Sequence, residues 1–196
     1  CLSFLTGLDT LSYMIEAGRY RRVLLIASEV CTGVNWDDYE TGTLFGDGAA
    51  AAVVEKCQAN DTSAILASRM ETYGKGATLS QCLAGGNKYL LEEYKSDPTS
   101  FLFTMDGKGL YKMAAQMLPG LVQQLLNDSK LTVNDIDLVI PHQASLSALE
   151  LTRRILGFTQ AKWMNILENR GNTIAASIPM ALHEAIVQKK LVRGQL

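Results

Sequence analysis

The apolar residues at the start of the chain recur every three or four positions: Leu2, Phe4, Leu5, Leu8, Leu11 and Ile15. This spacing predicts an amphipathic helix. After Gly18 and three arginines, residues 23–27 are apolar without a break, which predicts a short strand buried on both faces. A second strand, rich in small side chains, is predicted at 49–54 after a glycine-rich turn.

The last hundred residues repeat this change between helical and strand patterns. We expect, in order, a strand at 101–105, a helix at 110–126, a helix start at 132–135, a buried strand at 136–140, a helix at 146–156 closed by Gly157, a strand near 163–167 and a helix from about 174 to 190. Pro119 interrupts the helix at 110–126 and predicts a kink. Strands that alternate with helices predict the α/β class, with helices packed on a parallel or mixed sheet.

The middle of the chain has a weaker pattern. From 58 to 100 the periodicity fades, and glycines, Asn60-Asp61 and Asp97-Pro98 indicate loop-rich structure. We therefore divide the chain into residues 1–57, a connecting or inserted segment at 58–100, and residues 101–196.

The overall composition argues against several classes of protein. The chain is 47% hydrophobic and 19% charged, which is typical of a globular domain. Eighteen basic residues against 20 acidic ones, with no basic block, argue against a nucleic-acid partner. No apolar run approaches the roughly 18–20 residues of a membrane span.

The four cysteines, at 1, 31, 57 and 82, show no C-x-x-C spacing, and the chain has only two histidines. A structural zinc site is therefore not expected. A chain of this length and apolar content needs no disulfide framework, so we predict a cytoplasmic protein with thiols free to react.

The chain begins with Cys1, for which we considered three interpretations. A lipidated bacterial protein would continue into a polar tether, and an amino-terminal nucleophile hydrolase would continue into a strand. The predicted helix argues against both. The third interpretation is a fragment that begins at the nucleophile of a larger enzyme.

Three segments stand where α/β folds keep reactive residues, between the end of a strand and the start of a helix. They contain Cys1, His142 and Asn172. A helix amino terminus lowers a thiol pKa, a histidine takes or donates a proton, and an asparagine amide binds an oxyanion. Each residue alone is more often structural, and an asparagine beside a glycine is usually a turn residue. Their joint occurrence in this order favours chemistry.

The motifs around these residues are, in order, Cys1, Phe45-Gly46-Asp47-Gly48-Ala49-Ala50, Pro141-His142-Gln143-Ala144, Gly171-Asn172-Thr173 and Ala176-Ser177-Ile178-Pro179. Together they resemble the β-ketoacyl-acyl-carrier-protein synthase III group of the thiolase superfamily. The resemblance covers nearly the whole chain apart from 58–100.

This resemblance implies a thiolase-like layered α/β/α/β/α fold of two similar halves. Residues 1–57 would be the remainder of the first half, and residues 101–196 the second half without its final strands, so the fold would be incomplete at both ends. We therefore expect unpaired strand edges, uncovered apolar faces and little condensing activity from this chain by itself.

The resemblance also implies an activity. Cys1 would accept an acyl group from acyl-CoA, and His142 and Asn172 would bind the carbonyl oxygen of a malonyl-type thioester that loses carbon dioxide. No permanently bound cofactor and no metal are implied. A homodimer is implied, acyl carrier protein is a further candidate partner, and the pathway would be fatty acid or related acyl or polyketide biosynthesis.

Several alternatives stay open. Relatives that use acyl carrier protein usually carry an arginine shortly after Pro-His-Gln-Ala, where this chain has Ser145, Ser147 and Glu150. A Cys-dependent acyltransferase, a non-decarboxylating long-chain acyl-CoA condensing enzyme, and an inactive or non-catalytic chain are the competing hypotheses. Cys31, Cys57 and Cys82 are expected to be structural, and His183 to be a packing or surface residue.

Overall fold

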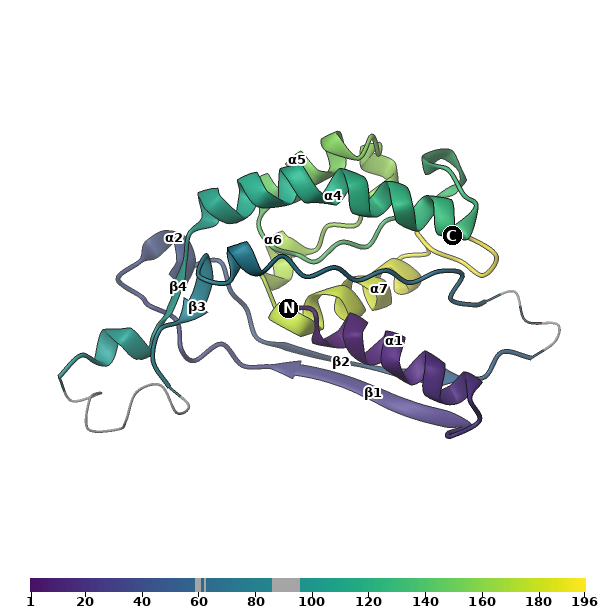
Figure 1. Cartoon of the computed structure of the whole chain (residues 1–196), viewed down its shortest axis with the longest axis horizontal. Helices are drawn as coiled ribbons and strands as arrows, with labels where there is room; N and C mark the ends of the chain where they lie inside the picture. The colour runs from purple at the N-terminus through teal and green to yellow at the C-terminus, as the bar shows by residue number, and fades with distance from the viewer. Residues whose placement is uncertain (59–60, 62, 86–95) are drawn as a thin grey trace.

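A computed structural model describes residues 1–58, 61, 63–85 and 96–196 (Figure 1). The helices are α1 (Ser3–Glu16), α2 (Tyr39–Gly42), α4 (Gly107–Ser129), α5 (Leu146–Ile155), α6 (Leu167–Arg170) and α7 (Ser177–Val187). The strands are β1 (Arg22–Glu29), β2 (Gly48–Glu55), β3 (Ser80–Cys82) and β4 (Phe103–Met105). Short 3₁₀ turns lie at Gly74–Gly76, Pro98–Phe101, Val133–Asp135, Gln160–Lys162 and Ile174–Ala176.

The elements form layers, with α4 and α5 on one side, the β1–β2 hairpin on the other, and α1, α6 and α7 between them (Figure 1). Strands β1 and β2 pair antiparallel along their whole length, from Arg22 opposite Glu55 to Glu29 opposite Gly48. The described part of 58–100 contains only short turns and β3, as its weak periodicity predicts.

Only one face of the β1–β2 hairpin is covered. Leu25 and Ala27 point inward and pack with Phe4 of α1. On the other face Leu24, which is opposite Val53, is 58% exposed and Val53 is 62% exposed. The prediction that 23–27 is buried on both faces is therefore wrong for the outward positions, because a continuous apolar run does not reveal which face another layer covers.

The strand edges agree with the expectation of open edges. Within the described ranges, β1 is paired only with β2, and β2 only with β1. One edge of each strand therefore has no backbone partner among the residues that the structure describes, and the outward face of the hairpin is apolar.

The helices of the second half follow the predicted pattern closely. Helix α4 begins after Asp106, whose carboxylate accepts from Gly109 N at 2.9 Å, and continues through Pro119 without ending there. Helix α5 ends at Ile155, just before Gly157, which has a φ of 78°. The helix start at 132–135 is a single 3₁₀ turn with a capping box between Thr132 and Asp135.

The strands predicted at 136–140 and 163–167 are wrong as extended strands. They are reduced to one parallel bridge between Val139 and Trp163. Leu138 N donates instead to Leu196 O at 3.0 Å, and Ile166 N donates to the Gln143 side chain at 2.9 Å. Backbone groups that a ladder would have paired thus bond to the last residue and to a buried amide.

One close backbone contact joins the two halves of the chain. Phe45 forms a parallel bridge with Asn172, Gly46 N donates to Asn172 O at 3.1 Å, and Asn172 N donates to Leu44 O at 2.9 Å. A Cβ atom on Gly46 would lie 2.1 Å from Arg170 O. Only glycine fits at this position, because any side chain would overlap a backbone oxygen.

We predict that Gly46→Ala destabilises the fold by about 3 kcal/mol, because the new methyl must push two backbone segments apart. Gly120→Ala is the matched control: a Cβ there meets nothing within 4 Å, and alanine in a helix should stabilise by about 0.5–1 kcal/mol. Urea unfolding of both variants measures the difference. Equal stabilities would contradict the close contact.

Candidate active site

Cys1 is exposed and lies two positions before the first residue of α1. Helix α1 has no side-chain cap, since Leu2 occupies the N-cap position. Phe4, which is 4% exposed, packs with Ala175 and Ala176 of the turn before α7. The start of α1 is therefore held against the segment that carries Asn172, where the N terminus lies in Figure 1.

His142 lies in the loop that follows the Val139 bridge and precedes α5. Its Nδ1 atom is 2.6 Å from the Ser177 hydroxyl oxygen. Burial lowers the pKa of His142 to about 4. The imidazole is therefore neutral at pH 7.

Asn172 is 5% exposed and its side chain is fixed by two hydrogen bonds. Its Oδ1 accepts from Ile174 N at 3.0 Å, and its Nδ2 donates to Ala144 O at 3.3 Å. The second bond joins Asn172 to the loop that carries His142. An amide nitrogen has two N–H donors, so this bond uses one of them.

The turn after Asn172 contains a strained residue. Ile174 has a φ of 50°, a left-handed conformation that a β-branched side chain rarely adopts. Backbone strain of this kind costs about 1–3 kcal/mol and persists where the surroundings enforce it. Here Ile174 N donates to Asn172 Oδ1 and Ala175 N donates to Glu29 Oε1 at 3.3 Å. The Asn172 side chain therefore helps to hold the strained turn that follows it in the chain.

Two residues of the site, Gln143 and Ser177, belong to the sequence motifs but were given no role of their own in the predicted site. Gln143 is completely buried, and its amide donates to Pro141 O at 2.9 Å and accepts from Ile166 N at 2.9 Å. Ser177 is also completely buried and bonds to His142. The sequence signalled these two residues only as polar positions within the motifs. Their hydrogen-bond partners could not be found from local spacing, because Ile166 lies 23 positions from Gln143 and His142 lies 35 positions from Ser177.

Thr173 is the residue next to Asn172 and is completely buried. Its hydroxyl oxygen has no hydrogen-bond partner among the described residues. Its methyl group lies 3.0 Å from the position that a Cβ on Gly48 would occupy. Thr173 therefore packs against the glycine motif through its methyl group.

The segments that carry Cys1 and His142 thus both contact the segment that carries Asn172. The arrangement offers a thiol before a helix, a neutral imidazole and a fixed amide. A thiolate is a nucleophile, and the two nitrogen groups can stabilise charge on an oxygen.

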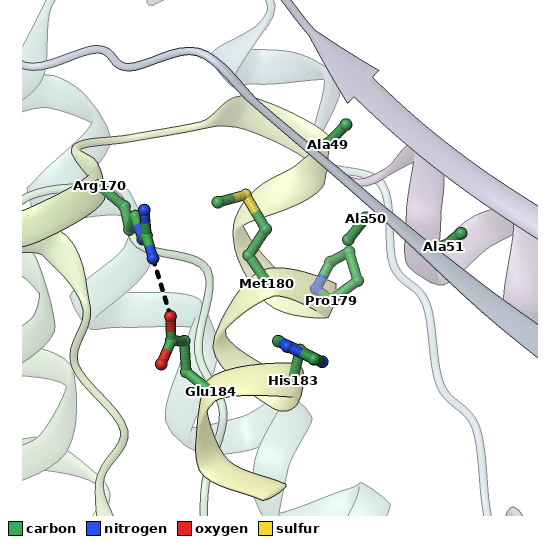
Figure 2. A pocket seen from close by; sticks show the side chains of 8 residues that line it. All are labelled: Ala49, Ala50, Ala51, Arg170, Pro179, Met180, His183 and Glu184. Atoms are coloured by element: carbon green, nitrogen blue, oxygen red, sulfur yellow. Dashed lines mark hydrogen bonds and ion pairs between the residues drawn. The ribbon is translucent and has the colours of Figure 1, made fainter. Parts of the chain in front are cut away.

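A separate pocket lies between β2 and α7 (Figure 2). It has a volume of about 410 Å³ and is lined by Ala49–Ala51, Arg170, Pro179, Met180, His183 and Glu184. Arg170 donates to Glu184 at 3.0 Å, so the charges in this pocket are already paired. His183 is exposed there, as expected for a surface residue. None of the three candidate residues lines it.

A smaller pocket of about 220 Å³ lies beside α1, between Leu2, Leu5, Leu8 and the segment at 65–70. All four cysteines are free thiols, and burial beside Asp47 and Glu29 raises the pKa of Cys31. The described residues contain no group of three or more potential metal ligands. In the described part of the chain, no helix is long and apolar enough to cross a membrane.

Two family models match the chain. The model for 3-oxoacyl-[acyl-carrier-protein (ACP)] synthase III matches residues 1–74, and the model for its C-terminal part matches residues 126–196. Together the two matches cover more than half of the chain.

Individual proteins give the same result. The β-ketoacyl-[acyl-carrier-protein] synthase III of Nostoc sp. is 36% identical over 194 residues, which are 97% of this chain and 58% of that protein. The crystal structure of the Aquifex aeolicus synthase III has a TM-score of 0.87 at 33% identity and covers 100% of this chain and 58% of that one. The Pseudomonas aeruginosa PAO1 synthase III also has a TM-score of 0.87, at 27% identity, over 99% of this chain.

These matches establish the expected thiolase-like α/β fold. The chain spans less than two thirds of the length of these relatives, 58% in the examples above. With both family models and the fold in agreement, the chain belongs to the 3-oxoacyl-[acyl-carrier-protein] synthase III family.

Proposed function

We propose that the native protein is an acyl-thioester condensing enzyme of the β-ketoacyl-ACP synthase III type. The observation that carries the proposal is the contact between three segments: Phe4 fixes the start of α1 on the turn after Asn172, and Asn172 bonds to the His142 loop. Membership in the family supports the same reaction class.

In the first step, the Cys1 thiolate attacks the carbonyl carbon of an acyl-CoA thioester. The new bond is a thioester on Cys1, and coenzyme A leaves as its thiolate. The position before α1 favours the thiolate, because the helix amino terminus carries a partial positive charge. Covalent catalysis of this kind splits carbon–carbon bond formation into two easier steps.

In the second step, a malonyl-type thioester places its carbonyl oxygen against His142 and Asn172. Loss of carbon dioxide leaves its bonding electrons as an enolate, whose negative oxygen accepts hydrogen bonds from both side chains. The enolate carbon attacks the acyl-cysteine and releases the Cys1 thiolate. The neutral imidazole suits this role, because it donates a hydrogen bond without giving up its proton.

The carrier of the second thioester depends on the surface of α5. Shortly after Pro-His-Gln-Ala, where carrier-protein-dependent relatives are expected to have an arginine, this chain has Ser145, Ser147 and Glu150. Arg153 and Arg154 both bond to Glu150, at 2.7 and 2.5 Å, and Arg153 also donates to Phe158 O. Arg154 is 71% exposed and is the cation of this pair that a partner can reach. Acyl carrier protein and a homodimer stay predictions.

Acyl-CoA should add the mass of its acyl group at Cys1 of the native protein. Peptide mass spectrometry after incubation with a panel of acyl-CoAs measures this adduct. Cys1→Ser should lose it, and Cys57→Ser, which removes another exposed thiol, should keep it. An adduct on Cys31 or Cys57 with Cys1 unmodified would contradict the assignment.

Asn172→Ala should reduce malonyl-dependent condensation and carbon dioxide release by about 10²–10³-fold, the usual cost of losing one oxyanion donor. Acylation of Cys1 should be nearly unchanged, because Asn172 acts in the second step. Asn172→Asp keeps the acceptor for Ile174 N but removes the amide donor, so it separates chemistry from turn stability. An acyltransferase would transfer its acyl group without malonyl-dependent carbon dioxide release.

The pH dependence of the free energy of unfolding should reveal the lowered pKa of His142. Its pKa is about 4 in the fold and about 6.5 when unfolded, so the unfolded chain binds the proton more tightly between these values. The contribution of His142 to the free energy of unfolding is fully present above about pH 6.5. The free energy of unfolding should fall by on the order of 2–3 kcal/mol as the pH drops to about 4. His142→Gln should lack this component in urea unfolding. The same slope in both proteins would show that His142 is not buried in its neutral form.

A further inference from the structure

We propose that Ser177 is a positioning residue that fixes the tautomer of His142, with the proton on Nε2. The catalytic consequence rests on the proposed function, but the assignment of the tautomer does not. The evidence is a chain of hydrogen bonds from the backbone of Gln143 through the Ser177 hydroxyl to the imidazole ring.

The direction of this chain follows from what each atom can donate. The Ser177 oxygen is 2.6 Å from His142 Nδ1 and 3.4 Å from Gln143 N. A backbone N–H can only donate, so the hydroxyl oxygen accepts from Gln143. In the described part of the chain, His142 Nδ1 is the remaining partner of this hydroxyl. The hydroxyl proton therefore points to Nδ1, which must accept it.

A neutral imidazole carries one N–H, so a ring that accepts at Nδ1 has its proton on Nε2. The opposite arrangement would place a proton on Nδ1 and leave the hydroxyl proton without an acceptor. Because Ser177 is completely buried, water does not replace the missing acceptor. The geometry thus favours one tautomer through the cost of an unsatisfied donor.

The hydroxyl is held rigidly enough to act in this way. Ser177 is the first residue of α7 and follows the turn that presents Asn172. On the other side, the buried Gln143 amide fixes the histidine loop through Pro141 O and Ile166 N. Both partners of the hydrogen bond are therefore anchored in the core, and neither can turn away at small cost.

The result matters for the proposed condensation. With the proton on Nε2, His142 and Asn172 both present N–H groups to the thioester oxygen. With the proton on Nδ1, Nε2 would present a lone pair and repel the developing negative charge. Ser177 therefore decides whether the neutral histidine is a donor or an acceptor toward substrate.

The test is ¹⁵N NMR of histidine-labelled protein, in which the two ring nitrogens of a neutral imidazole have distinct chemical shifts when protonated and unprotonated. The chain has two histidines, and His183→Gln assigns the signals. We expect His142 to have a protonated Nε2. In Ser177→Ala, the Nδ1-protonated form should become a substantial fraction. Ser129→Ala, which removes a hydroxyl bonded to Leu125 O and Leu126 O, should leave the signals unchanged.

A native His142 protonated on Nδ1, or identical shifts in native protein and Ser177→Ala, would overturn the inference. If Ser177→Ala fails to fold, Ser177→Cys keeps a side chain of similar size with a weaker donor and should show a smaller shift of the same sign. In the active protein, Ser177→Ala should lower condensation by about 10-fold while sparing acylation of Cys1. An inactive native protein with the expected NMR result would refute the proposed function and leave the tautomer assignment intact.

Discussion

The close approach of the backbone at 44–46 to the backbone at 170–172 is the constraint on which the candidate site depends. A Cβ on Gly46 would lie 2.1 Å from Arg170 O, so the two segments touch with no side chain between them. Hydrogen bonds between the two segments hold the backbone of Asn172 in place. The Asn172 side chain donates a hydrogen bond to Ala144 O in the loop that carries His142. A glycine in the first half of the chain thereby sets the position of an amide in the second.

Buried polar groups around this contact make the site rigid at some cost in stability. Gln143, Thr173 and Ser177 are all completely buried, and the Gln143 and Ser177 side chains are hydrogen-bonded to the loop and ring that they support. The Thr173 hydroxyl has no partner in the described structure, and Ile174 keeps a left-handed backbone. The strained Ile174 and this Thr173 hydroxyl both lie close to Asn172 in the chain. Strain of this kind is common near functional sites.

Much of the secondary structure follows from local pattern, because helix periodicity and caps act within a few residues. Helices α1, α4 and α5 lie where apolar spacing and Gly157 predict them. The strands were less predictable, since a strand depends on distant partners. The outward face of β1 is open, and the strand expected at 136–140 is a single bridge, because Leu196 O accepts the backbone hydrogen bonds of Asp137 and Leu138.

The sequence by itself determined the family, the kinds of reactive group and the helices that precede or follow them. Those features depend on residue type, order and short spacing. Only the tertiary structure decided that Ser177 lies 2.6 Å from the histidine, that the His142 pKa falls to about 4, and that Gly46 admits no side chain. Proton position, burial and close backbone contact depend on atoms brought together from distant parts of the chain, which local spacing does not encode.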